Sequence, residues 1–305
     1  MRILLQFPEG LKQRGFELMQ KYQSEGHEVF LSASACYGAC DISLDEARWI
    51  KADKIVHFGH NKFVRSELEI PIEYVPYTID LDLRIIEEFA PKLKEYKTIA
   101  ILTTVQNIHQ MPQIKEIFAN NGITVLTETG FWAREPGQVL GCDALSIKKL
   151  ESRIEAVLYI GDGMFHPLAI ESKKPVYIFN PTTKEFRAVN KDIELLHKRR
   201  KASIIKAVDC KRFAILVSTK VGQFNLGHAE YAKRELEKRG KQCAILVANE
   251  LEPITVNNFL VFDCYVNTAC PRIVDDTVEF GKPILNIDGV NQVCKILDEL
   301  DKNSN

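Results

Sequence analysis

Three expected loops of this chain combine cysteine with glycine or proline. Cys40 lies in SACYGACD, Cys142 in EPGQVLGCD and Cys270 in NTACPR. Three thiolates suit a 4Fe-4S cluster with one iron left open, and an open iron is a Lewis-acid position for an amine and a carboxylate. Cysteines so far apart in sequence form no local signature, so a plain thiol-rich binding module is an alternative.

The remaining cysteines differ in their surroundings. Cys210 lies in a basic connector, and Cys36 forms a C-x3-C pair with Cys40 that could be half of a zinc site. We identify no second close cysteine pair and no matching histidine pair, which disfavours zinc, and the C-x3-C-x2-C triplet of ordinary radical enzymes is absent. Three further cysteines fall within apolar runs and are expected to be small core residues: Cys243, Cys264 and Cys294.

The bulk composition excludes several classes of protein. The chain has 305 residues, with 40 basic and 41 acidic ones, so we expect no broad nucleic-acid footprint and no polybasic membrane anchor. The N-terminal apolar run is broken by Pro8, Glu9 and Gly10, and no later run reaches the ~18 apolar residues of a membrane span. The sequence therefore predicts a cytoplasmic protein, whose thiols stay reduced.

Three segments that could position the cysteines begin alike, each with an apolar run typical of a strand buried on both faces of a parallel sheet. These runs are RILLQFPEG (2–10), TIAILTTVQ (98–106) and RFAILVSTKVGQ (212–223). A helix is predicted after each run, over Leu11–Ser24, Met111–Asn120 and His228–Arg239. Each helix is expected to end at a glycine in the left-handed conformation: Gly26, Gly122 and Gly240.

Further strands complete each unit. Second strands are predicted over 27–33, 123–129 and 241–248, third strands over 53–60, 155–163 and 259–267, and fourth strands over 72–78, 174–181 and 282–288. This alternation predicts three α/β domains with parallel sheets, over residues 1–92, 93–200 and 201–305, joined by charged connectors. The basic run 198–201 is interpreted as a solvated helix face.

The three loop cysteines then share one location, the carboxyl end of a parallel sheet, where sites in open α/β sheets form. If the domains pack around a common pseudo-three-fold axis, the loops of Cys40, Cys142 and Cys270 converge. A duplicated scaffold would explain the strands, but it would not explain why a cysteine follows a strand in every unit.

The motifs CYGACD, GQVLGCD and NTACPRI occur in this order together with QFPEG, TTVQ, GDGMFHP and KVGQ. In this combination the chain resembles the diphthamide synthesis family, specifically its single-chain archaeal members, from about Arg2 to Ile287. The resemblance implies three similar Rossmann-like domains around one 4Fe-4S cluster, with Cys40, Cys142 and Cys270 as its ligands. It implies a homodimer as well.

The resemblance also implies the reaction. A reduced cluster cleaves S-adenosylmethionine between the sulfur and the γ-carbon, which gives methylthioadenosine and a 3-amino-3-carboxypropyl radical. The radical adds to C2 of a histidine imidazole in translation elongation factor 2, as the first step of diphthamide biosynthesis. The enzyme is thus expected to be a radical transferase that needs an electron donor, which the sequence does not identify.

Six further residues are candidate contacts of S-adenosylmethionine or the cluster. They are Gln6, Gln106, Asp162, His166, Gln223 and Arg272. The three glutamines are interpreted as equivalent positions after the first strand of each unit, where an amide binds the substrate or caps a loop. His166 is interpreted as a ligand contact or a structural histidine. Arg272 could pair with a carboxylate or tune the cluster potential.

Two alternative functions belong to related classes. A quinolinate synthase also resembles a three-fold α/β protein with a three-cysteine cluster, but YGAC and GDGMFHP favour the diphthamide family. A non-catalytic partner that delivers electrons is the second alternative. All three cysteine positions are filled, which favours a self-sufficient enzyme.

Overall fold

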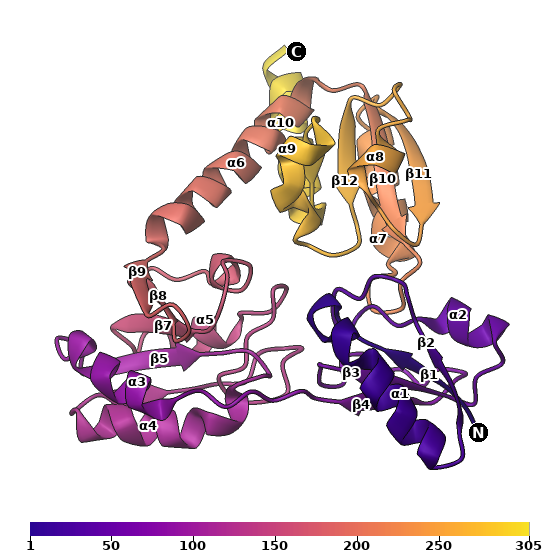
Figure 1. The fold of residues 1–305 in the computed structure, drawn as a ribbon. Helices are drawn as coiled ribbons and strands as arrows, with labels where there is room; N and C mark the ends of the chain where they lie inside the picture. The colour runs from indigo at the N-terminus through magenta and orange to yellow at the C-terminus, as the bar shows by residue number, and fades with distance from the viewer. Residues whose placement is uncertain (305) are drawn as a thin grey trace. The chain divides into compact units, whose positions relative to one another are not determined.

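The computed structural model describes residues 1–304, which form three mainly parallel β-sheets with helices on their faces (Figure 1). The predicted α/β fold with three similar sheets is confirmed. Within residues 1–304, none of the helices combines the length and the apolar composition that a membrane crossing requires.

The first and third sheets share one topology. The strand order is β2-β1-β3-β4 in the first sheet and β11-β10-β12-β13 in the third, with every pair parallel. The strands of the first sheet are β1 (Arg2–Gln6), β2 (Glu28–Leu31), β3 (Lys54–Phe58) and β4 (Ile72–Val75). Those of the third are β10 (Arg212–Ser218), β11 (Gln242–Ala248), β12 (Cys264–Asn267) and β13 (Ile284–Leu285). The predicted third strand of this unit thus begins at Cys264, because residues before it form a turn.

The middle sheet has the same order with one additional strand, β6-β5-β7-β8-β9. Its strands are β5 (Thr98–Leu102), β6 (Thr124–Leu126), β7 (Ala156–Ile160), β8 (Val176–Asn180) and β9 (Glu185–Ala188). The edge strand β9 is antiparallel to β8 and was not predicted. A short turn joins the two strands, and such a connection allows only antiparallel pairing.

Helices follow the first strands as predicted. They are α1 (Gly15–Ser24), α4 (Met111–Asn120) and α7 (Leu226–Glu237). The helix predicted over 11–24 begins instead as a 3-10 helix over Glu9–Arg14, which leads into α1. The three glycines after them have positive φ angles of 84°, 76° and 74°, which confirms the predicted helix ends.

Two long helices were not predicted as such. The charged connector before the third unit is the twenty-residue helix α6 (Asn190–Asp209), on which Lys198 and Lys201 are exposed. The second long helix is α10 (Ile287–Ser304). The shorter helices are α2 (Leu44–Trp49), α3 (Leu83–Phe89), α5 (Ser146–Leu150), α8 (Pro253–Val256) and α9 (Thr277–Phe280). Further 3-10 turns lie at Ala90–Leu93, Ile108–Gln110, Pro167–Ala169 and Ile273–Asp276.

The central strands are buried on both faces, as their continuous apolar runs predict. In β5, Ile99 and Ile101 pack against α3 and α4, whereas Ala100 and Leu102 pack toward α5 on the opposite face. The same alternation in β10 separates a core shared with α7 and α10 from a core shared with α8 and α9. Packing on both faces thereby restrains the central strands of these two sheets, from which the loops at the carboxyl ends start.

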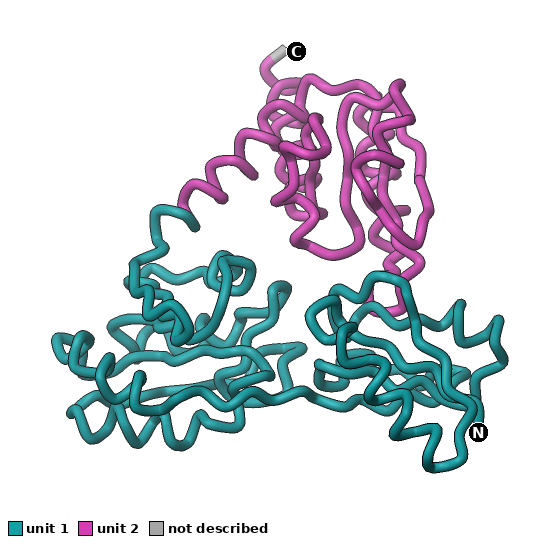
Figure 2. Tube along the Cα trace, viewed as in Figure 1, with its two compact units in different colours: residues 1–193 teal, residues 194–305 magenta. Residues whose placement is uncertain are grey.

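The chain divides into two compact units, Met1–Ile193 and Glu194–Asn305 (Figure 2). The first unit contains two of the three sheets. Helix α3 packs against the middle sheet although it precedes the predicted domain boundary at residue 92. The limit between the two units falls within α6, before the predicted boundary at residue 200.

We expect Gly122→Ala to lower the free energy of unfolding by about 1 kcal/mol, because a side chain in the left-handed conformation is strained even where space is open. Nothing lies within 4 Å of a Cβ built at Gly122, so backbone strain is the only expected cause. Urea denaturation measures the change. Gly227→Ala is the control, because Gly227 lies in α7 with equally open space and no positive φ. Equal effects of the two substitutions would contradict the prediction.

Candidate functional site

The carboxyl end of each sheet is organised around one pair of neighbouring residues. The last paired position of the first and third strands is Gln6–His57 in the first sheet, Leu102–Tyr159 in the second and Leu216–Asn267 in the third. The chain connections diverge on either side of this strand pair, so it is the topological switch point, where open α/β sheets bind ligands. In every sheet the third-strand residue is polar and reaches into the neighbouring loop.

Gln6 fixes the loop that carries Cys40. Its side chain is fully buried, its Nε2 donates to the Asp41 carbonyl at 2.8 Å, and its Oε1 accepts from the Ser43 amide at 3.2 Å. Both hydrogen bonds lie directly after Cys40 in sequence. The structure assigns the Gln6 amide to this loop, and its predicted contact with S-adenosylmethionine stays a prediction.

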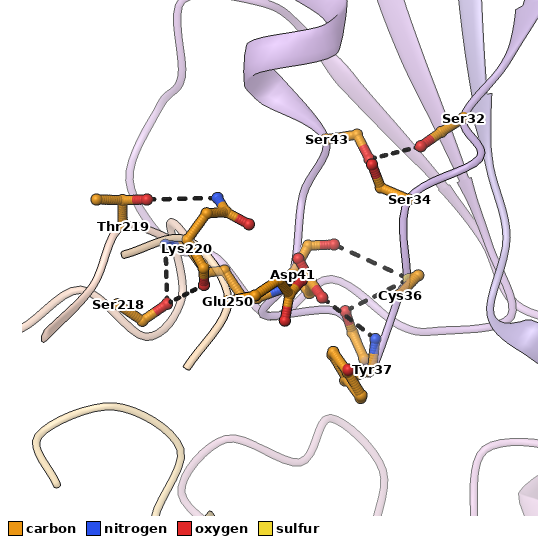
Figure 3. Close-up of polar contacts among 12 residues, drawn as sticks. Ser32, Ser34, Cys36, Tyr37, Asp41, Ser43, Ser218, Thr219, Lys220 and Glu250 are labelled. Atoms are coloured by element: carbon orange, nitrogen blue, oxygen red, sulfur yellow. Dashed lines mark hydrogen bonds and ion pairs between the residues drawn. The ribbon is translucent and has the colours of Figure 1, made fainter. Parts of the chain in front are cut away.

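Asp41 holds the same loop from the other side. It is 5% exposed, its Oδ2 accepts from the Tyr37 amide at 3.3 Å, and its backbone N–H donates to Gly38. Figure 3 shows Asp41 beside Tyr37 and Cys36 in this loop. The turn leaves Cys40 partly exposed at the carboxyl end of the first sheet.

Cys142 lies at the tip of a two-residue turn. Leu140 and Asp143 exchange both backbone hydrogen bonds at 3.0 Å, which leaves Gly141 and Cys142 as the turn residues. A Cβ at Gly141 would overlap the ring of Phe165, so a larger residue there would have to displace that ring. The turn exposes Cys142.

The buried carboxylate of Asp143 anchors that turn. The side chain is 2% exposed, and its Oδ2 accepts from the amides of Trp132 at 2.5 Å and Ala133 at 3.0 Å. Its Oδ1 accepts from the Leu145 amide at 3.2 Å. The Cys-Asp dipeptide therefore has the same physical role in the first two sheets, in which a buried carboxylate holds the cysteine that precedes it.

Cys270 is positioned by asparagines instead. Asn267 Nδ2 donates to the Cys270 carbonyl at 2.8 Å and to Asn286 Oδ1 at 2.7 Å, and Asn286 Nδ2 donates to the Pro271 carbonyl at 3.0 Å. Both asparagines act on the backbone, so the thiol itself remains available at the end of β12. Burial raises the pKa of the Cys270 thiol, and the backbone N–H and positive charge of Arg272 oppose this effect.

Arg272 is held in an ion-pair network. Its Nε lies 2.5 Å from Asp275 Oδ2, and Arg200 of α6 lies 2.7 Å from the other carboxylate oxygen. The side chain is only 8% exposed. Its charge thus acts on Cys270 from a fixed position, whereas its predicted roles toward a substrate or a cluster stay predictions.

The predicted residues Asp162 and His166 lie in the loop after β7. Tyr159, at the third-strand position, places its hydroxyl 3.4 Å from the Asp162 carbonyl and 3.5 Å from His166 Nδ1. The His166 ring packs against Tyr159 and, edge to face, against Phe165. The Asp162 side chain is exposed and accepts a hydrogen bond from Asn180.

The three predicted glutamines do not occupy equivalent positions. Gln6 is the last residue of β1, whereas Gln106 and Gln223 lie in loops after β5 and β10. By strand register, the counterparts of Gln6 are Leu102 and Leu216. Gln106 is partly exposed and contacts Thr104, and the Gln223 backbone caps a turn begun at Lys220.

One buried lysine was missed. Lys220, in the KVGQ motif after β10, is 5% exposed, and its Nζ lies 2.6 Å from Glu250 Oε1. Its backbone N–H donates to Ser218 Oγ at 3.2 Å (Figure 3). The sequence signal is weak: Lys220 is the second residue after β10, and a lysine is rarely buried unless it is paired, as it is here with Glu250.

A histidine pair was also missed. His57 Nε2 and His60 Nδ1 lie 2.9 Å apart, and the sulfur of Cys36 lies near both. The sequence signal is HFGH at residues 57–60, so our expectation that no matching histidine pair exists is wrong.

The residues at these sheet ends fit an iron–sulfur cluster by the chemistry of their donors. Each of the three sheets presents one cysteine with at least partial exposure, in a loop held by hydrogen bonds from neighbouring polar residues. Three thiolates can hold a 4Fe-4S cluster and leave one iron open to another ligand. The fold and the cysteines together define a three-sheet α/β protein with one cysteine, in a loop held by hydrogen bonds, at the end of each sheet.

Comparison with known proteins identifies the family. The model of the family described as "Putative diphthamide synthesis protein" matches residues 7–303. The 2-(3-amino-3-carboxypropyl)histidine synthase of Pyrococcus horikoshii is 36% identical, over 93% of this chain and 83% of the relative. Subunit 1 of the Caenorhabditis elegans synthase is 28% identical, over 93% and 73%. This chain belongs to the diphthamide synthesis family.

A solved structure supports the same conclusion. The crystal structure of Dph2 from Pyrococcus horikoshii with a 4Fe-4S cluster matches with a TM-score of 0.87 and 34% identity. The match covers 97% of this chain and 86% of that one.

We expect Asp143→Asn to loosen the Cys142 turn and to lower the free energy of unfolding by about 1–3 kcal/mol. An amide has one acceptor oxygen, so at least one of the N–H groups now bonded to the carboxylate loses its partner in a buried site. Urea denaturation measures the loss. Asp80→Asn is the control, because that side chain is exposed and pairs with His109. The anchoring role is wrong if the two variants are equally stable.

Proposed function

We propose that this chain is a 2-(3-amino-3-carboxypropyl)histidine synthase. It transfers the 3-amino-3-carboxypropyl group of S-adenosylmethionine to C2 of a histidine imidazole in translation elongation factor 2, as the first step of diphthamide biosynthesis. The observation that carries this proposal is the presence of one fixed cysteine at the carboxyl end of every sheet. The family match over residues 7–303 supports it.

Cys40, Cys142 and Cys270 are proposed to hold one 4Fe-4S cluster. When bound, the cluster supplies the open iron and the electron that breaks the bond between sulfur and γ-carbon. The protein keeps each thiolate in place through hydrogen bonds to the loop backbone. Gln6 donates to the Asp41 carbonyl, Asp143 accepts from the Ala133 amide, and Asn267 donates to the Cys270 carbonyl. Fixed ligands matter because a misplacement of about 1 Å can cost ~100-fold in rate.

The substrate contacts are proposed at four residues of the loops after the central strands. Gln106 and Gln223 offer amides for the methionine carboxylate or the adenine, and Asp162 and His166 lie on the loop after β7. Arg272 adds a positive charge that favours the Cys270 thiolate and an anionic substrate group.

The proposed partners are elongation factor 2 as protein substrate, a second copy of the chain, and an electron donor that is not identified. The proposed location is the cytoplasm. A quinolinate synthase activity and a purely electron-delivering role are the alternatives that the experiments below separate.

Replacement of Cys40, Cys142 or Cys270 by serine is expected to abolish or severely reduce cluster binding, because each is proposed as one of three ligands. Cys36→Ser is expected to retain about four irons per chain, as for an intact cubane. Iron analysis and the optical spectrum of anaerobically purified protein measure this. Cys294→Ser is the control, since Cys294 is a buried core residue. Loss of iron from Cys36→Ser with retention in Cys40→Ser would reverse the assignment in that loop.

Reduced enzyme is expected to convert S-adenosylmethionine into methylthioadenosine and to attach the carboxyl label to elongation factor 2. The test is anaerobic incubation with dithionite and carboxyl-labelled S-adenosylmethionine, followed by chromatography of the nucleosides and measurement of label on the protein. Omission of dithionite is the control for the need of an electron. Accumulation of 5′-deoxyadenosine without labelled elongation factor would overturn the proposed bond cleavage, and no product from the chain alone would favour an electron-delivery role.

A further inference from the structure

We propose that Cys36, His57 and His60 bind one divalent zinc ion at a site separate from the three-cysteine cluster. The ligand atoms of these three residues all lie within 4.8 Å of one another. The site belongs entirely to the first sheet: His57 is in β3, His60 follows it, and Cys36 lies in the loop after β2.

The hydrogen bonds of Gln6 determine the tautomer of His57. Because the Ser43 amide can only donate, the Gln6 atom that faces it is the acceptor Oε1. The same oxygen lies 3.0 Å from His57 Nδ1, so His57 must carry its proton on Nδ1 and donate it. The lone pair is then on Nε2, the atom directed toward His60.

A metal-bound histidine is usually held in the same way. Ligating imidazoles generally donate their other N–H to an oxygen acceptor, which fixes both tautomer and ring orientation. Gln6 provides that acceptor for His57. The residue is itself fully buried and held by the Asp41 carbonyl, so the histidine ring cannot easily turn away.

Burial shields this pair of histidines from solvent. His57 is fully buried, and His60 is partly buried. Tyr74, opposite His57 on β4, adds to the cover, with its ring centre 5.4 Å from that of His57.

The donor set selects the class of metal. One thiolate and two imidazole nitrogens suit zinc and other late transition metals, whereas Mg²⁺ and Ca²⁺ prefer oxygen. In tetrahedral zinc sites the bond lengths imply ligand separations of about 3.3 Å between nitrogens and about 3.5 Å between nitrogen and sulfur. The histidine nitrogens are 2.9 Å apart and would have to separate by about 0.4 Å, while Cys36, a loop residue that is 3% exposed, would have to move toward them. Water can complete the fourth position.

A metal here would cross-link β3 to the Cys40 loop. Cys36 and Cys40 belong to the same loop. The carbonyl of Asp41, the residue after Cys40, accepts a hydrogen bond from Gln6 and also lies near the Cys36 sulfur. The zinc site therefore fixes the loop that supplies one cluster ligand, and it explains a second cysteine that the cluster does not use. It does not depend on the proposed reaction, because zinc binding is measured without substrate.

The test uses the anaerobically purified, cluster-containing protein. Metal analysis is expected to find one zinc per chain after dialysis, and zinc K-edge X-ray absorption, which does not detect iron, is expected to show sulfur and nitrogen neighbours. Cys36→Ser and His60→Gln are expected to weaken zinc binding at least about tenfold, since even the loss of a residue that only hydrogen-bonds to a ligand costs about 10–100-fold in metal affinity. Their iron content is expected to be unchanged.

Two variants serve as matched controls, Cys294→Ser for loss of a buried thiol and His109→Ala for loss of a histidine, and both should keep zinc. Circular dichroism identifies variants that fail to fold. If both test variants fail to fold, zinc titration of the folded wild-type protein decides whether the site binds zinc. Zinc binding that both test variants retain, a purely oxygen-ligated zinc, or no binding of added zinc by folded wild-type protein would overturn the proposal. Loss of iron from Cys36→Ser would overturn it as well, because Cys36 would then serve the cluster.

Discussion

The hydrogen bonds made by buried polar side chains at the sheet ends are the constraint on which the site depends. A parallel sheet brings its loops to one edge, but it does not fix their conformation. In this chain a glutamine, two aspartates and two asparagines hold the loop backbones that carry the cysteines. Unmade hydrogen bonds in such buried positions would cost about 1–3 kcal/mol each, so the loops are strongly confined to one arrangement.

The cysteine loops of the three repeats are thus held in place by different side chains. The first two sheets use an aspartate that directly follows the cysteine, whereas the third has proline there and uses Asn267 and Asn286. A proline removes a backbone donor, and the loop is instead held through carbonyl acceptors. The repeats also share a polar residue at the same position of the third strand, but only in the third sheet does that residue, Asn267, hold the cysteine loop.

The sequence predicted the central strands well because burial on both faces leaves a continuous apolar run, as in β5 and β10. It predicted the cysteine loops because glycine and proline mark strand ends. The prediction failed for α6, because its many charged residues resemble a linker and only a few apolar side chains of the helix pack into the cores. It also failed for the expected equivalence of Gln6 with Gln106 and Gln223. Register is a property of pairing between strands, and no single segment contains it.

The proximity of His57 to Cys36 could not be predicted from the sequence for the same reason. HFGH is visible in sequence, but its histidines become a candidate ligand pair only because β3 lies beside β1 and the Cys36 loop follows β2. Gln6, on β1, is the residue that joins the two parts, since one amide holds both the Cys40 loop and the His57 ring. A change at Gln6 would therefore act on the Cys40 loop and on the His57 ring at once, and its place at the end of the central strand β1 keeps it fully buried between them.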